Sequence, residues 1–333
     1  MVQGSSFKDL SVAIIPYPAL GDVTIGLRLA WIFRYAGSRV CFYSSLIWSA
    51  REYFPWLDIL PDENLSLPDL SPKYDLLIGH IIWSSQSDEL AADCLQLNNI
   101  AYLKSKNSKN GLGLDKRNTF VRGRSYPGAN RPICLDSKAG LSMVQWIDKY
   151  AHEVFDLDCP EPVPVHSFVS RESPNTKVAI FPTSALAKKD YPLRAWLWLA
   201  NRLTKDGWTV DFVCLPKEQA AIQKVCANFA VRSFPNIKEL MDYLSDRAAV
   251  ISNDSGGGHL ASLMGKKTFT ITRRKGSFSW RPGFNELNYV LAPLIGLKLF
   301  GCYIWRPFIP IWRIPARLGK APDKSSAYRH QQL

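Results

Sequence analysis

The chain has 333 residues, of which 47% are hydrophobic and 21% charged, a composition that suits two folded domains of ordinary size. No run of 18 apolar residues occurs, and the first ten residues lack a cationic region followed by an apolar core. We therefore expect neither a transmembrane helix nor a secretory signal. The net charge of +12 is divided unevenly, with −2 over residues 1–165 and +14 over residues 166–333, which favours an anionic partner. We expect no nucleic-acid partner, because the sequence has no zinc-finger spacing, RNP motif or helix-turn-helix signature.

Cysteine and histidine usage argues against a metal centre. The seven cysteines and five histidines are dispersed, without CxxC pairs or clustered histidines. We therefore expect no metal site and free thiols in a reducing cytoplasm.

The first half alternates between predicted strands and helices. We expect strands at 12–15, 39–43, 74–79 and 100–103 and helices at 23–35, 88–97 and 140–155. Gly21 and Asp22 stand at the turn after the first strand, where open parallel sheets bind ligands. Asp22 is predicted to cap the helix, to face a ligand, or to do both.

The segment from 104 to 131 interrupts this alternation and is strongly basic. Its cations suit a phosphorylated or carboxylated acceptor, whereas a solvated, disordered loop is the alternative. They are Lys104, Lys106, Lys109, Lys116, Arg117, Arg122 and Arg124. The proline-dense stretch 159–165 predicts a linker, which gives domains at 1–165 and 166–292 and a basic aromatic tail at 293–333.

The second half alternates more clearly. Predicted strands lie at 177–181, 208–214, 231–234, 248–252 and 267–271, and predicted helices at 195–204, 217–228, 237–245 and 258–264. Alternation of this kind indicates parallel βαβ units. The predicted fold class is therefore α/β, with two Rossmann-like domains that face each other across a cleft.

Two turns of the second half carry residues suited to phosphate groups. The loop 182–192 offers two hydroxyls and two cations, Thr183, Ser184, Lys188 and Lys189, although a solvated loop has the same composition. The turn 254–261 follows an apolar strand and starts a helix with Asp254, Ser255, Gly256, Gly257, Gly258 and His259. Glycines admit an anion close to the backbone, and a helix N-terminus offers it N–H groups. Glu218 follows a strand, where it either bonds ribose hydroxyls or begins a helix.

Three of these motifs, in this order, resemble the lipopolysaccharide heptosyltransferases of glycosyltransferase family 9. They are Gly21-Asp22, then Lys189-Asp190-Tyr191-Pro192, then Asp254 to Ala261. The chain departs from the family at Tyr191, where tryptophan is usual, and at 26–30, where the family has an apolar-Pro-Ala stretch.

The resemblance implies the GT-B fold and the inverting transfer of a heptose, with ADP-heptose as the expected donor and the lipopolysaccharide core as acceptor. It makes Asp22 the general base and Lys189 the diphosphate cation, or Lys188 if the alignment shifts by one. Ser255, Gly256 and Gly257 would donate to phosphate oxygens, Asp254 would organise the turn or bond a sugar hydroxyl, and His259 would contact the leaving group or stabilise the fold. The nucleotide sugar is a substrate, so no cofactor is expected.

Two alternatives remain: a transferase of this fold that uses another nucleotide sugar, and a non-catalytic nucleotide-sugar or glycan-binding protein. The tail over 294–318 mixes aromatic and cationic residues, which suits a membrane interface or packing on the first domain. We expect a lipid-linked anionic oligosaccharide acceptor and peripheral attachment at the inner face of the cytoplasmic membrane.

Overall fold

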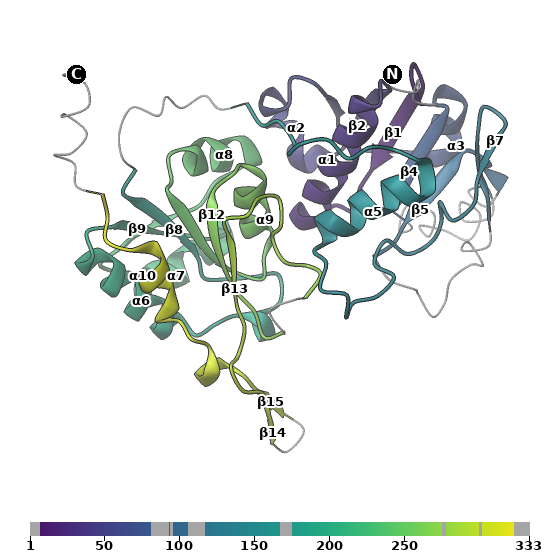
Figure 1. The fold of residues 1–333 in the computed structure, drawn as a ribbon. Helices are drawn as coiled ribbons and strands as arrows, with labels where there is room; N and C mark the ends of the chain where they lie inside the picture. Colours follow the sequence, from purple (N-terminus) through teal and green to yellow (C-terminus); the bar gives the residue numbers. More distant parts are fainter. Residues whose placement is uncertain are drawn as a thin grey trace, which may run out of the picture. The chain divides into compact units, whose positions relative to one another are not determined.

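The computed structural model describes residues 7–80, 93, 96–105, 117–166, 175–274, 278–299 and 302–322. The chain divides into two compact units, Met1–His166 and Ser167–Leu333. Each unit is a parallel sheet with helices packed on it, which confirms the predicted α/β class (Figure 1).

The first unit is built on a five-stranded parallel sheet. Its strand order is β3-β2-β1-β4-β5, so the order changes direction between β1 and β4. The strands are β1 Ser11–Ile15, β2 Arg39–Tyr43, β3 Asp58–Leu60, β4 Leu76–His80 and β5 Ile100–Leu103. The helical segments are α1 Leu20–Tyr35, α2 Ser45–Trp48, η1 Arg51–Tyr53, α3 Leu67–Leu70, η2 Ser71–Lys73 and α5 Met143–Phe155. The helix expected at 88–97 lies mostly outside the described residues.

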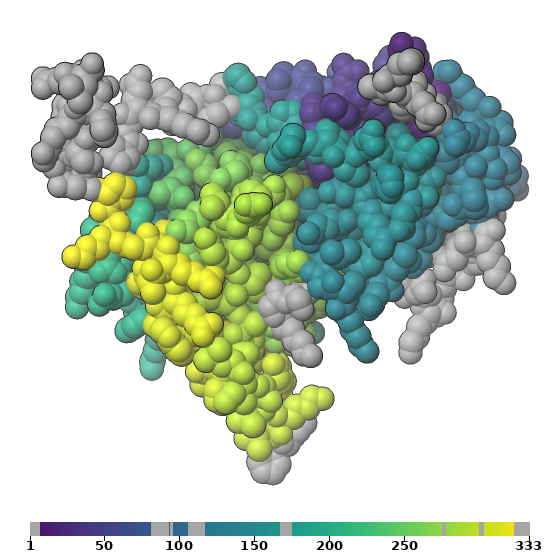
Figure 2. Space-filling model, viewed as in Figure 1, coloured from purple at the N-terminus to yellow at the C-terminus, as the bar shows by residue number. Residues whose placement is uncertain are grey.

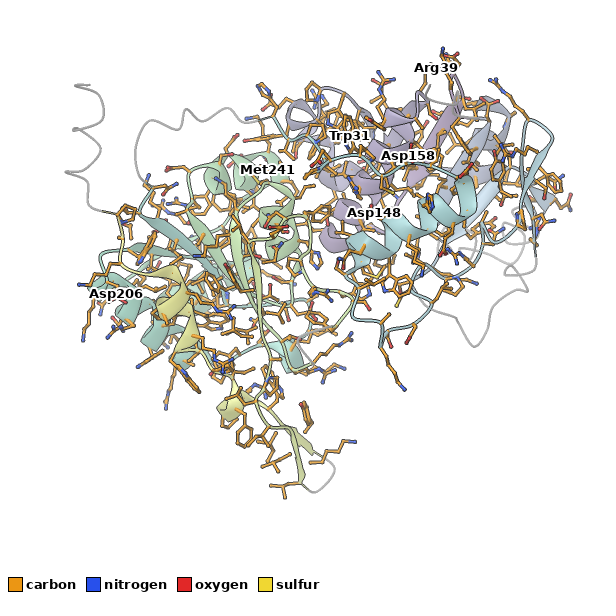
Figure 3. The ribbon with its side chains drawn as sticks, viewed as in Figure 1. Trp31, Arg39, Asp148, Asp158, Asp206 and Met241 are labelled. Atoms are coloured by element: carbon orange, nitrogen blue, oxygen red, sulfur yellow. The ribbon has the colours of Figure 1, made fainter. Side chains whose placement is uncertain are left out.

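Helices α1 and α5 pack side by side and hold the predicted linker (Figure 3). Arg28 on α1 is buried, and its Nε donates to Asp148 Oδ1 on α5 at 2.7 Å. The guanidinium also donates to the carbonyls of Pro160 and Glu161, and Trp31 Nε1 donates to the latter at 3.1 Å. A buried arginine is tolerated because each of these acceptors compensates its desolvation. The proline-dense segment is thereby fixed to the first unit.

The basic segment between β5 and α5 contains a hairpin where the sequence suggested a disordered loop. Strands β6 Thr119–Val121 and β7 Arg124–Tyr126 pair antiparallel. Their turn places Arg122 and Gly123 at φ values of 46° and 80°, as a tight hairpin turn requires. Asn130, which is 2% exposed, accepts a hydrogen bond from the backbone N–H of Tyr102 in β5 and donates to Thr119. Such distant contacts could not be inferred from local composition.

The second unit is built on a six-stranded parallel sheet of order β10-β9-β8-β11-β12-β13, which changes direction between β8 and β11. The strands are β8 Lys177–Phe181, β9 Thr209–Val213, β10 Ala230–Arg232, β11 Ala249–Asn253, β12 Lys267–Ile271 and β13 Asn288–Leu291. The helical segments are η5 Ala187–Lys189, α6 Leu193–Lys205, η6 Pro216–Glu218, α7 Gln219–Val225, α8 Ile237–Ser245, α9 Gly256–Leu263, η7 Arg306–Phe308 and α10 Arg313–Leu318. The helix predicted at 217–228 is thus shorter, and β13 was not predicted.

The C-terminal tail is part of the second unit. Trp305, Ile309, Ile311 and Ile314 are at most 8% exposed and share the hydrophobic core that includes Trp196 of α6. Before them, β14 Leu297–Leu299 and β15 Cys302–Ile304 form a two-stranded hairpin that projects from this unit (Figure 2). The segment predicted as a separate tail is therefore anchored by its apolar side chains to the sheet of the second unit.

Candidate functional site

In each unit, candidate residues follow the two strands between which the strand order reverses. In the second unit these are β8, followed by the loop 182–192, and β11, followed by Asp254 and α9. In the first unit they are β1, followed by Asp22, and β4, which ends in His80. The carboxyl edge of a parallel sheet at such a reversal is the usual ligand site of this architecture.

The N-terminus of α9 presents unpaired donors. Ser255 is its N-cap residue by backbone conformation, yet its side chain caps nothing. Its Oγ is buried and has no hydrogen-bond partner within the part of the chain that the structure describes. Gly256 and Gly257 are the first helical residues, and the first N–H groups of a helix have no acceptor within it. A buried hydroxyl beside free N–H groups at a positive helix end suits a phosphate.

Two of the three glycines are required by packing. A Cβ on Gly257 would lie 2.6 Å from a ring carbon of Phe181 in β8, and one on Gly258 would lie 2.5 Å from Ser252 Oγ in β11. Both distances are shorter than real Cβ contacts, so the backbone at the start of α9 packs directly against the side chains of Phe181 and Ser252. The role predicted for these glycines was the close approach of an anion. Close packing is a second reason for them, and it brings the helix start to the ends of both strands.

Lys189 lies beside this helix start. Its Nζ is 3.1 Å from Asp254 Oδ2, and the two side chains are only 25% and 12% exposed. Lys188 is exposed, and its carbonyl accepts a hydrogen bond from Arg306. The geometry therefore favours Lys189 over Lys188 as the cation of the site. Asp254 holds this ammonium next to Ser255, a contact that was not predicted for it.

Asn253 organises the loop between β8 and α6, a role that the sequence analysis did not assign. It is fully buried at the end of β11, where its Oδ1 accepts from the backbone N–H of Tyr191 and its Nδ2 donates to the carbonyl of Pro182. Its type and place, an asparagine that ends an apolar strand beside the glycine turn, were the available signal. Ser184 donates to Asp190 Oδ1 at 2.6 Å, so its hydroxyl also stabilises the loop.

Thr183 and Glu218 come together from neighbouring strand ends. Thr183 Oγ1 donates to Glu218 Oε2 at 3.0 Å, and the same oxygen accepts from the backbone N–H of Leu215. Glu218 therefore lies at the carboxyl edge of the second sheet, where it was predicted to bond ribose hydroxyls. Its bond from Leu215 also closes the helical turn that Glu218 ends.

His259 points into the protein. It is 3% exposed, and its ring lies edge-on to Trp280 with centroids 6.4 Å apart. Burial lowers the pKa of His259, with the carboxylate of Asp254 opposing that shift. A neutral, buried imidazole favours the structural role over direct contact with a leaving group.

Asp22 lies within the first turn of α1, at its third residue. The N-cap is Ala19, and Asp22 is a helical residue that makes no capping hydrogen bond within the described part of the chain, so the capping role considered for Asp22 is wrong. Burial raises the pKa of Asp22 to about 6, although its own backbone N–H opposes the shift. A carboxylate with a raised pKa at a ligand-binding edge suits proton transfer near neutral pH.

Three other residues lie at the same edge of the first sheet. His80 ends β4, and its ring lies 4.9 Å from that of Tyr17, which follows β1. Lys104 follows β5 and is 5% exposed. Burial lowers the pKa of both His80 and Lys104. His80 and Tyr17 were absent from the predicted site. Only the strand order shows that β1 and β4 are neighbours, so the sequence did not indicate that the residues at their ends meet.

The other described cations of the predicted acceptor set lie elsewhere. Arg122 forms a two-pronged ion pair with Asp75, at 2.8 and 3.2 Å, just before β4. Arg117 donates to the carbonyl of Leu97, before β5, and Arg124 lies over the ring of Tyr126. This is the amino edge of the sheet, about 13 Å from the carboxyl edge across a five-residue strand. The structure therefore does not bring these arginines together with Asp22. Lys106 and Lys109 lie outside the described residues.

Comparisons with known proteins agree with this architecture. Residues 134–292 match the family model of glycosyltransferase family 9 (heptosyltransferase). The E. coli ADP-heptose lipopolysaccharide heptosyltransferase II is similar at 16% identity and a TM-score of 0.62, over 97% of this chain and all of that one. E. coli heptosyltransferase WaaC with ADP is similar at 13% identity and a TM-score of 0.61, over 93% of this chain and 99% of that one. A family 9 glycosyltransferase of Veillonella parvula is similar at 14% identity and a TM-score of 0.64, over 98% of this chain and 97% of that one. A search of curated proteins gave no match.

The fold and the strand-end sites define a protein of the GT-B class. The family match over residues 134–292 confirms that this part of the chain resembles the heptosyltransferases of glycosyltransferase family 9. Among the residues that the structure describes, no helix is long and apolar enough to cross a membrane. Within the same residues, no group of three or more His, Cys, Asp or Glu side chains could hold a metal ion.

Proposed function

We propose that this protein is an inverting glycosyltransferase that moves a heptose or a related sugar from a nucleotide-sugar donor, with ADP-heptose the first candidate, to a lipopolysaccharide core acceptor. The observation that carries the proposal is the Lys189–Asp254 pair beside the hydroxyl of Ser255 at the start of α9, which has no hydrogen-bond partner among the described residues. Similar proteins of known structure include two named for ADP-heptose or bound to ADP.

The donor half of the reaction requires stabilisation of a departing diphosphate. In the proposed reaction Lys189 supplies the positive charge, and Ser255, Gly256 and Gly257 supply hydrogen-bond donors to the phosphate oxygens. Such preorganised donors act where negative charge develops, so they stabilise the transition state more than the ground state. Glu218 bonds the ribose hydroxyls. The proposed reaction uses no cofactor, because the donor is itself a substrate.

The acceptor half requires removal of a proton from the attacking hydroxyl. We assign this step to Asp22, whose pKa of about 6 leaves it ionised at neutral pH and still basic enough to accept a proton. Lys104, at the same edge, is the described cation best placed for an anionic acceptor group.

The reaction is tested by incubating the purified protein with a panel of nucleotide sugars, with and without core oligosaccharide, and measuring transfer by mass spectrometry. The proposal predicts transfer from ADP-heptose that is lost in Asp22→Asn. Transfer from another nucleotide sugar alone would identify the alternative donor. Binding of donors with neither transfer nor hydrolysis would indicate the non-catalytic alternative.

We also propose that the second unit attaches peripherally to the inner face of the cytoplasmic membrane, where a lipid-linked acceptor would lie. In support, the projecting hairpin exposes Leu297 and Leu299 by 43% and 49%, and Leu294, Ile295, Tyr303 and Trp312 of the same C-terminal segment are exposed by 40 to 57%. Residues 294–322 contain five lysines and arginines and no acidic residue. Exposed apolar and aromatic side chains among cations suit an anionic lipid surface.

Vesicle co-sedimentation tests this attachment. The wild type should bind anionic vesicles at low salt, bind less at high salt, and bind neutral vesicles weakly. The triple variant Leu297→Ser/Lys298→Glu/Leu299→Ser should lose binding. A matched control, Leu215→Ser/Lys224→Glu/Val225→Ser, removes two exposed apolar side chains and one lysine elsewhere on the second unit and should bind as the wild type does. Equal sedimentation of all three proteins would refute the attachment.

A further inference from the structure

The tail reaches back to the lysine loop of the candidate donor site through Arg306. Its Nε donates to the carbonyl of Asp190 at 2.9 Å, and its Nη2 donates to the carbonyl of Lys188 at 3.3 Å. These two carbonyls flank Lys189, the cation of the site. One guanidinium therefore holds the backbone on both sides of that residue from a position 116 residues further along the chain.

The position of Arg306 is itself fixed by the core of the second unit. Its guanidinium lies 4.9 Å from the ring of Trp305, which is 2% exposed. That ring contacts Tyr191, the loop residue after Asp190, with centroids 6.2 Å apart. An arginine fork on a buried aromatic side chain loses little further freedom on forming two hydrogen bonds.

The loop has few other constraints at this point. Residues 185–188 are exposed. The turn is closed by bonds within the loop, from Lys189 N to Leu186 O and from Asp190 N to Ala187 O at 2.8 and 3.0 Å, and by the hydroxyl of Ser184, which lies near Leu186 O and Asp190 Oδ1. Asn253 fixes the loop at Pro182 and Tyr191, which lie on either side of the turn. Arg306 adds two hydrogen bonds to the backbone of the turn itself, from a segment outside the loop.

We propose that Arg306 is a positioning residue that holds Lys189 against Asp254 before the donor binds. The placement of the loop by Arg306 rests on the contacts described above. The expected effect on donor binding rests, in addition, on the proposed donor site. Ordering the cation in advance removes an entropic cost from diphosphate binding.

Hydrogen exchange of the ligand-free protein tests the placement of the loop. In Arg306→Ala, the Lys189 and Asp190 amides should exchange at least several-fold faster, while the amides of β8 and β11 keep their rates. Arg306→Lys should restore protection only in part, because an ammonium cannot span both carbonyls as a fork does. Arg313→Ala removes an exposed arginine of the same tail and should change nothing. Unchanged loop rates in Arg306→Ala, or faster exchange throughout the sheet, would overturn the proposal.

Calorimetric titration with ADP tests the consequence. Arg306→Ala should weaken ADP binding by about three- to thirtyfold, which lies within the range of coupling between interacting residues, and leave adenosine binding unchanged. In the Lys189→Ala background, Arg306→Ala should have no further effect on ADP affinity. Additive losses in the double variant would overturn an action through Lys189. If the wild type bound no ADP, the proposed donor site would fail, and the exchange rates alone would confirm or overturn the placement of the loop by Arg306.

Discussion

Replacing Asp22 by asparagine should abolish activity and stabilise the protein at neutral pH. Burial raises the pKa of this carboxyl from 3.8 to about 6. Between those two pH values the folded protein binds its proton more tightly than the unfolded chain does. The free energy of unfolding therefore falls as pH rises through this window, and the loss is complete above pH 6.

The size of the effect follows from the pKa difference. Two units correspond to about 3 kcal/mol, and partial solvent access and the favourable helix N-terminus reduce this to about 1–2 kcal/mol. Asparagine keeps the shape of the side chain and removes the charge, so Asp22→Asn should gain about that much stability at pH 7.5. The gain should shrink as pH falls toward 4, where the wild-type carboxyl is protonated in the folded state.

Urea unfolding at several pH values measures the stability, and transfer assays measure the activity. A general base typically contributes a factor of about 10²–10⁴ in rate, so kcat should fall by that much while ADP affinity stays constant. Asp75→Asn is the matched control. Burial raises the pKa of Asp75, but hydrogen bonds from Arg122 and Ser11 lower it by a larger amount. The net pKa of Asp75 therefore lies below its usual value. That variant should therefore lose stability at pH 7.5. Near-normal turnover by Asp22→Asn, or a loss of stability at pH 7.5, would refute the reasoning.

Three further predictions concern the same sites. The kcat/KM of the wild type should fall on the acid side with an apparent pKa near 6, as Asp22 becomes protonated, and a flat profile from pH 5 to 8 would contradict this. Lys189→Ala should weaken the intact donor and ADP about tenfold or more, consistent with a charge-assisted contact, and leave adenosine unchanged in calorimetry; equal losses for all three ligands would indicate a folding role. Gly257→Ala should destabilise the protein by about 1–3 kcal/mol in urea unfolding, because the new methyl would overlap the Phe181 ring, and Gly257→Ala/Phe181→Leu should recover part of the loss. A tolerated Gly257→Ala would mean that α9 does not press on the sheet.

Much of the fold could be read locally. Strands such as Lys177–Phe181 and Lys267–Ile271 were predicted at their observed bounds, because a short apolar run between turn residues is a property of a few neighbouring positions. The glycine turn at 254–258 and the lysine loop were recognisable for the same reason. Their order along the chain, together with Gly21 and Asp22, was enough to indicate the family.

The tertiary structure decided which of these residues meet. Lys104 and Arg122 are both cations of one basic segment, yet they lie at opposite edges of the first sheet, because the chain passes along β5 and then turns back through β6 and β7. Arg306 reaches the lysine loop across 116 residues, a contact with no local signal. The raised pKa of Asp22 likewise arises from its burial in the folded protein, and the sequence around a carboxylate does not show how much solvent folding removes from it.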